Sequence, residues 1–118
     1  MNNRFKFRVW DEVNNKFYSQ EVLNALPLNV FLASKHIQQY IGLNDKNGKE
    51  VYEGDIVQYN QNSSYDNMNF IAKWSDDKLG FIFQSNSGDE LLNQTPHLNR
   101  FKHLEVVGNI FENSELLK

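Results

Sequence analysis

Two carboxylates lie close together in the middle of the chain, in the segment Glu53-Gly54-Asp55. Residues two apart in an extended segment point to the same side, so Glu53 and Asp55 could hold Mg²⁺ or act as an acid and a base. Alternatively, Asp55 can accept hydrogen bonds from backbone N–H groups after Gly54 and fix the entry into a strand. We favour this structural role and keep a nuclease that uses both carboxylates as a lesser hypothesis.

Other residue types that perform catalysis or hold cofactors occur without the spacing that such sites need. Cysteine is absent, which excludes disulfides, thiolate metal sites and cysteine nucleophiles. His36, His97 and His103 have no second ligand at helical spacing, whereas a metal site needs several converging ligands. The glycines lack the spacing of a phosphate-binding loop, and no Gly-x-Ser-x-Gly motif is present. We therefore predict no enzyme activity, no catalytic residue, no metal and no cofactor.

Basic and aromatic residues occur together in two segments and form a candidate interaction surface. It consists of Arg4, Lys6, Arg8, Trp10, Arg100 and Lys102. Exposed aromatic and basic side chains could stack on single-stranded nucleic acid and follow its backbone. The alternative is an ordinary half-buried strand, in which Phe5 and Phe7 face the core and the charged residues face the solvent. We favour the half-buried strand.

The overall composition favours a small β protein. The chain has 118 residues, 40% of them hydrophobic and 14% aromatic, which is enough for the core of one domain. It has 17 Asn and three Ala, which disfavours a helical bundle because Asn side chains compete for backbone hydrogen bonds. The net charge of −3 weighs against a dedicated duplex-DNA binder. No apolar run could span a membrane and the N-terminus lacks the apolar region of a secretory signal, so we expect a cytoplasmic protein with no membrane partner.

Hydrophobic alternation and turn residues predict mostly short strands. A β-hairpin is expected from residues 4–10 and 17–18, followed by a helical turn over residues 21–26. Further strands are predicted over residues 36–41, 51–52, 56–59, 70–74, 81–84 and 104–111. From Tyr52 onward, the strands are separated by turns at the spacing of a small barrel or sandwich. The predicted fold class is therefore mainly β with a minor α content.

Several positions at predicted turns and strand ends carry backbone signals. Asn47-Gly48 predicts a hairpin turn, and Gly54 predicts a tight bend into the next strand. Gly108 predicts a bulge in the last strand, and Asn113 is expected to cap a helical turn near the C-terminal end.

We expect one compact unit over residues 1–118. The densest turn signal lies near residues 42–48. It marks possible subdomains, an N-terminal β-rich part over residues 1–43 and a barrel over residues 44–118.

Three segments of the chain together resemble one known family. They are Phe7-Arg8-Val9-Trp10-Asp11, the stretch from Gln39 to Val57, and the stretch from Val107 to Leu117. In order and spacing they resemble the YopX family of bacteriophage and prophage proteins, and the middle stretch is the most specific. The chain departs from the family pattern at Ile41, where Thr is usual, and at Ser114, where Pro is usual.

The resemblance implies a fold and an origin but no reaction. It implies a phage or prophage protein with a small SH3-like barrel in its C-terminal part, preceded by an N-terminal β-hairpin subdomain. It also implies self-association. The family supplies no catalytic residue to carry over.

Two functional hypotheses follow from these features. The leading one is a non-enzymatic module in the bacterial cytoplasm that forms a homo-oligomer or binds a host or phage protein. The alternative is a nucleic-acid-binding module that uses the stripes Arg4/Lys6/Arg8 and Arg100/Lys102.

Overall fold

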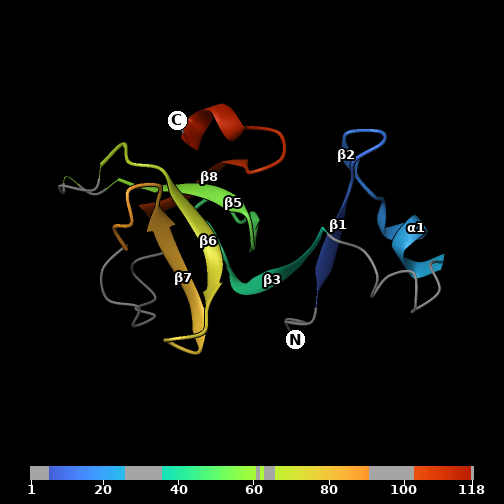
Figure 1. The fold of residues 1–118 in the computed structure, drawn as a ribbon, viewed down its shortest axis with the longest axis horizontal. Helices are drawn as coiled ribbons and strands as arrows, with labels where there is room; N and C mark the ends of the chain where they lie inside the picture. The colour runs from blue at the N-terminus through green and yellow to red at the C-terminus, as the bar shows by residue number, and fades with distance from the viewer. Residues whose placement is uncertain (1–5, 26–35, 61, 63–65, 91–102, 118) are drawn as a thin grey trace.

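The computed structural model describes residues 6–25, 36–60, 62, 66–90 and 103–117, which form two four-stranded antiparallel sheets (Figure 1). The strands are β1 (Phe7–Asp11), β2 (Lys16–Phe17), β3 (Ile37–Asn44), β4 (Glu50–Tyr52), β5 (Asp55–Tyr59), β6 (Phe70–Ser75), β7 (Gly80–Ser85) and β8 (Leu104–Asn109). The helices are α1 (Gln20–Ala25) and the 3₁₀ helix η2 (Ser114–Leu117). The prediction of a mainly β fold with a minor α content is confirmed.

The first sheet has the strand order β2-β1-β3-β4. β1 pairs antiparallel with both β2 and β3, so the predicted N-terminal hairpin is confirmed. Burial increases along β1, from Phe7, which is 37% exposed, to Val9, which is 1% exposed. Phe7 shares the face of Val9, as predicted, but it lies at the end of the strand and is not buried in the core.

The second sheet has the strand order β7-β6-β5-β8 and curls into a half-barrel, as expected for a small barrel-like fold (Figure 1). Its core contains Val57, Phe70, Ala72 and Leu104, together with Val51 from β4 of the first sheet. Each of these side chains is at most 1% exposed. The two sheets therefore share one core, since β4 supplies a side chain to the half-barrel.

β8 contains the bulge that Gly108 predicts. Ile56 on β5 pairs with Gly108, whereas the next residue, Val57, pairs with Val106. The register therefore shifts by one residue, which bends the strand and lets the half-barrel curve.

The end of β8 differs from the prediction of a strand over residues 104–111. The Asn109 side-chain oxygen accepts hydrogen bonds from the N–H groups of Phe111 and Glu112, at 3.0 and 2.9 Å, and these bonds turn the chain away from the sheet. The Asn113 side chain was expected to cap η2, but its Oδ1 accepts from the N–H of Asn109 at 3.1 Å. Both differences have the same cause. The Asn109 side chain bonds to the backbone of the residues that follow it, and the Asn113 side chain bonds back to the Asn109 N–H.

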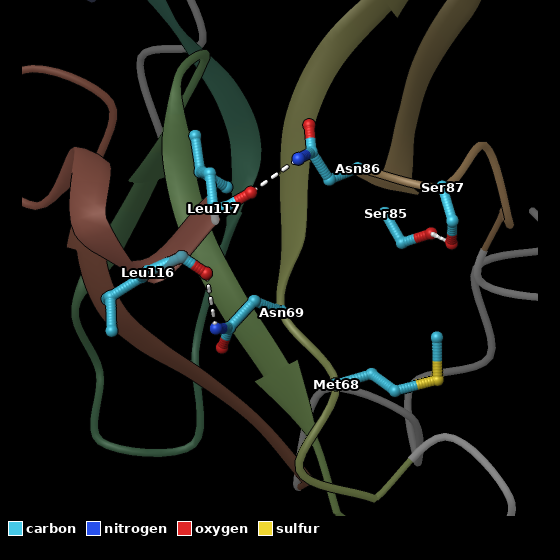
Figure 2. Close-up of a pocket in the computed structure, with 7 residues that line it drawn as sticks. All are labelled: Met68, Asn69, Ser85, Asn86, Ser87, Leu116 and Leu117. Atoms are coloured by element: carbon cyan, nitrogen blue, oxygen red, sulfur yellow. Dashed lines mark hydrogen bonds between the residues drawn. The ribbon is translucent and has the colours of Figure 1, made fainter.

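The C-terminal helix η2 connects opposite parts of the second sheet (Figure 2). It follows β8, and the Asn69 amide just before β6 donates to the Leu116 carbonyl at 2.8 Å. The Asn86 amide just after β7 donates to the Leu117 carbonyl. A depression of about 410 Å³ lies beside these contacts. η2 thus ties the edge strand β8 to the ends of β6 and β7.

Two further predictions concern turns, and both are confirmed. Gly48 and Gly54 adopt positive φ values of +80° and +84°, which residues with a side chain rarely adopt. The division into subdomains at residues 43 and 44 stays a prediction; the first sheet itself extends to Tyr52. Among the described helices, none combines the length and apolar character needed to cross a membrane.

The bulge at Gly108 gives a test of the fold. A Cβ atom at Gly108 would lie 2.6 Å from Asn113 Oδ1, which is already bonded to Asn109. We expect Gly108→Ala to lower the free energy of unfolding by about 1–3 kcal/mol through overpacking, measured by urea denaturation. Gly80→Ala is the matched control, since its Cβ would meet only the Lys78 carbonyl at 3.8 Å. Equal stability losses in the two variants would contradict the tight contact at the bulge.

Candidate functional site

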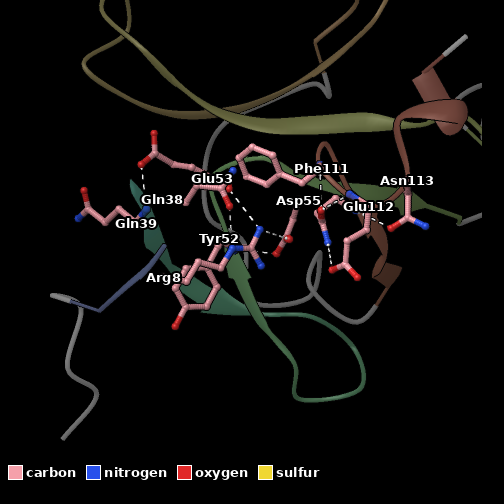
Figure 3. A network of polar contacts seen from close by, with 10 residues as sticks. Arg8, Gln38, Gln39, Tyr52, Glu53, Asp55, Phe111, Glu112 and Asn113 are labelled. Atoms are coloured by element: carbon pink, nitrogen blue, oxygen red, sulfur yellow. Dashed lines mark hydrogen bonds and ion pairs between the residues drawn. The ribbon is translucent and has the colours of Figure 1, made fainter. Parts of the chain in front are cut away.

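Arg8 on β1 connects the two sheets through its guanidinium group (Figure 3). Its Nη2 forms an ion pair with Asp55 Oδ1 on β5 at 2.6 Å. Its Nε donates to Gln38 Oε1 on β3 at 2.7 Å. The side chains of Arg8 and Asp55 are 16% and 1% exposed, so the pair is largely excluded from water. Sequence reasoning missed this pair, because no local pattern links residues 47 positions apart.

Asp55 is buried at the start of β5 and its second carboxylate oxygen is also bonded. Oδ2 accepts from the N–H of Tyr52 at 2.8 Å. Burial raises the pKa of the Asp55 carboxyl, and the Arg8 charge and the Tyr52 hydrogen bond oppose that shift. The structural role favoured for Asp55 was to accept a backbone N–H at the entry into a strand. The carboxylate makes this contact with Tyr52, and it also forms an ion pair with Arg8.

Two aromatic rings contact the Arg8 guanidinium. Its central carbon lies 4.4 Å from the ring centre of Phe17 on β2 and 4.8 Å from that of Tyr52 on β4. A cation over an aromatic face is attracted by the ring's quadrupole. Burial, followed by the Glu50 carboxylate, raises the pKa of Tyr52 to about 12. Tyr52 is therefore a neutral partner for Arg8 at physiological pH.

Glu53 has its own partner, separate from that of Asp55. Glu53 Oε1 accepts from the N–H of Gln39 at 2.9 Å, and Gly54 makes the turn between the two acids. Each acid is thus bonded to different groups of the protein, Glu53 to the backbone of β3 and Asp55 to Arg8 and Tyr52. This arrangement supports a structural use of both side chains.

A third carboxylate, Asp45, has a comparable structural use that sequence reasoning missed. Its Oδ1 accepts from the N–H groups of Asn47 and Lys49, each at 2.9 Å, within the turn before β4. Its Oδ2 accepts from the N–H of Val106 on β8 at 3.0 Å. An acidic residue two positions before Asn47-Gly48 was the local signal for the turn, but nothing local indicated the bond to β8.

The candidate interaction surface is described only in its N-terminal part. Lys6 is exposed and pairs with Glu50. Trp10 is 8% exposed, and its ring stacks on Phe111 with the centres 5.0 Å apart and the planes at 3°. Arg8 and Trp10 are thus engaged within the chain. Arg4, Arg100 and Lys102 lie outside the described residues.

A metal site needs several acidic or histidine side chains that converge on one point. No three His, Asp or Glu side chains among the described residues are grouped to hold an ion. Every buried side-chain nitrogen and oxygen in this part of the chain has a hydrogen-bond partner. The polar interior is therefore consistent with a structural network of ion pairs and capped turns.

Comparison with known proteins decides the family. A family model described as YopX protein matches residues 22–118. The chain belongs to the YopX family. The resemblance is therefore confirmed. The match includes its second and third segments and Asp55, whereas the first segment, Phe7–Asp11 with Arg8, precedes the matched region.

A solved structure has a similar fold. The crystal structure of protein EF1440 from Enterococcus faecalis is 24% identical to this YopX protein, with a TM-score of 0.62. The likeness covers 96% of this chain and 97% of that one. No curated protein matches the sequence. The comparison therefore shows the fold alone.

The ion pair gives a prediction with a pH dependence. Arg8→Met leaves Asp55 buried without its partner, so we expect a loss of about 3–5 kcal/mol in the free energy of unfolding at neutral pH. Without Arg8 the pKa of Asp55 rises further, so the folded state binds a proton that the unfolded state releases. Stability of the variant therefore falls with increasing pH, and the loss should be larger at about pH 7 than at about pH 4.

Urea denaturation of the wild-type protein and Arg8→Met between about pH 4 and pH 7 measures the difference in their free energies of unfolding. The control is the double variant Arg8→Met/Asp55→Asn, which removes the buried charge and keeps an acceptor for the Tyr52 N–H. Its stability loss should be smaller than that of Arg8→Met at neutral pH and independent of pH. A loss for Arg8→Met that does not change with pH would show that Asp55 is not the group left unpaired.

Proposed function

We propose that this YopX protein is a non-enzymatic phage or prophage module that binds further copies of itself through the β6–β7 hairpin. The observation that carries the proposal is a partly exposed aromatic pair, Trp74 and Phe81, close to the turn of that hairpin. Trp74 is 47% exposed and Leu79, in the turn, is 79% exposed. Large apolar side chains grouped on a surface are typical of protein interaction sites.

The aromatic pair is held in one conformation before any partner arrives. Trp74 and Phe81 pair across the two strands, with ring centres 5.3 Å apart and planes at 81°. The indole Nε1 of Trp74 also donates to Asp76 Oδ1 at 2.9 Å. An anchored ring loses little conformational freedom on binding, and Trp is enriched among the residues that contribute most to interfaces.

The position of the hairpin in the sheet favours the same surface. β7 is the edge of the second sheet in the strand order β7-β6-β5-β8. The end of β7 is bridged to the chain that follows it, at Gln84 and Glu90, and the earlier part of an edge strand can pair with another strand. A second copy can therefore contact both the aromatic pair and the strand beside it.

Charge supports a second copy as the partner. The hairpin as a whole carries two lysines and two aspartates, although Lys73 points to the face opposite Trp74 and Lys78 pairs with Glu90; the whole chain has a net charge of −3. Two hairpins can therefore approach each other without the repulsion that two acidic surfaces would experience. The nucleic-acid alternative has less support, because Arg8 is ion-paired and Trp10 is buried.

Removal of the exposed ring tests the proposal. We expect the wild-type protein to show a concentration-dependent mass in sedimentation equilibrium. In Trp74→Ala the dissociation constant should rise at least about 30-fold, as for the loss of an interface anchor. Val13→Ala is the matched control, because Val13 is 88% exposed on the other hairpin. A wild-type protein that stays monomeric at tens of micromolar, or equal effects of the two variants, would refute self-association through this hairpin.

A further inference from the structure

We propose that a groove between the two sheets binds a small organic anion with an apolar body. The groove lies where the start of β3, the β4–β5 turn, β6 and the segment after β8 meet. Its volume is about 440 Å³, within the roughly 300–1,000 Å³ of ligand sites in proteins. It is separate from the Trp74 surface, since neighbouring residues of β6 point to opposite faces of the sheet.

The lining of the groove is mainly apolar. It includes Ile37, Ile71, Ala72, Ile110 and Phe111. Ala72 is fully buried, whereas the other four side chains keep part of their surface in contact with water. Covering this surface with an apolar group releases water from it, which favours binding.

The charged groups at the groove select an anion. His36 interacts with Glu12, and Glu53 accepts from the N–H of Gln39. Lys73 is exposed, and its side chain forms no hydrogen bond or ion pair with any residue that the structure describes. Glu53 is thus held by a backbone N–H. Lys73 is the charged side chain of the groove that no described residue engages, so it can pair with an anion.

Gln38 supplies a second donor for the anion. The residue is 6% exposed, and its Oε1 accepts from Arg8 Nε at 2.7 Å, which fixes the orientation of the amide. Its Nε2 lies over Gly54, where a Cβ would be only 2.0 Å away, and it donates to no described group. Both residues line the groove. Gln38 is largely buried but its Nε2 atom is not, so this N–H is open to the groove and can bind a carboxylate oxygen.

The experiment uses the full chain and three probes that differ only in charge. Phenylbutanoate, its neutral amide and phenylbutylammonium are titrated while the amide signals of the ¹⁵N-labelled protein are followed. We expect saturable shifts at Gly54, Ala72 and Ile110 with phenylbutanoate. The amide should bind about 2- to 5-fold more weakly, the amount expected for an exposed ion pair, and the ammonium compound more weakly still.

Substitutions of Lys73 and Gln38 test whether these two donors cause the preference for an anion. Lys73→Met should reduce the affinity for phenylbutanoate to that for the amide, and Lys73→Glu should reverse the order of the charged probes. Gln38→Glu keeps an acceptor for Arg8 but removes the donor, so it should also weaken phenylbutanoate binding. Lys46→Met, in the turn before β4, removes the same charge outside the groove and should change nothing. An absence of saturable shifts, equal affinity for phenylbutanoate and its amide, or an unchanged Lys73→Glu variant would overturn the proposal.

Discussion

The arrangement of the two sheets depends on one buried ion pair between Arg8 and Asp55. β1 and β5 belong to different sheets and are separated by most of the N-terminal half of the chain, so their relative position needs a contact of this kind. The geometry is good enough to offset the cost of burial, because both carboxylate oxygens are bonded and two rings face the guanidinium. The pair specifies one packing, since a shifted β1 would leave two charges without partners.

Short polar side chains then fix the turns around this pair. Asp45 binds two N–H groups of its turn and one of β8, Glu53 binds an N–H of β3, and Asn109 turns the chain after β8. Each of these backbone groups would otherwise lack a partner at a strand end. The segments that identify the family are therefore the ones that hold the backbone. A match to them reports the fold and contains no information about a reaction.

The features that depend on neighbouring residues could be predicted from the sequence. The strands, the N-terminal hairpin, the turn at Gly48 and the bulge at Gly108 follow from alternation and from backbone preferences. The prediction failed where a contact with a distant element determines how deeply a side chain is buried. Alternation placed Arg8 and Phe7 on opposite faces but could not show that Arg8 is the more buried of the two, because Asp55 comes from another sheet.

Side chains that are already bonded within the chain are unavailable to a binding partner. The acids of the family motif and the ring of Trp10 have partners within the chain, so they are not available for binding. Two exposed side chains lie next to each other on β6, where Lys73 and Trp74 point to opposite faces of the strand. β6 pairs on both sides with other strands, which makes it a rigid support for both surfaces. The fold of this chain therefore keeps its stabilising polar contacts inside, and the two proposed binding surfaces would use the two faces of a single strand.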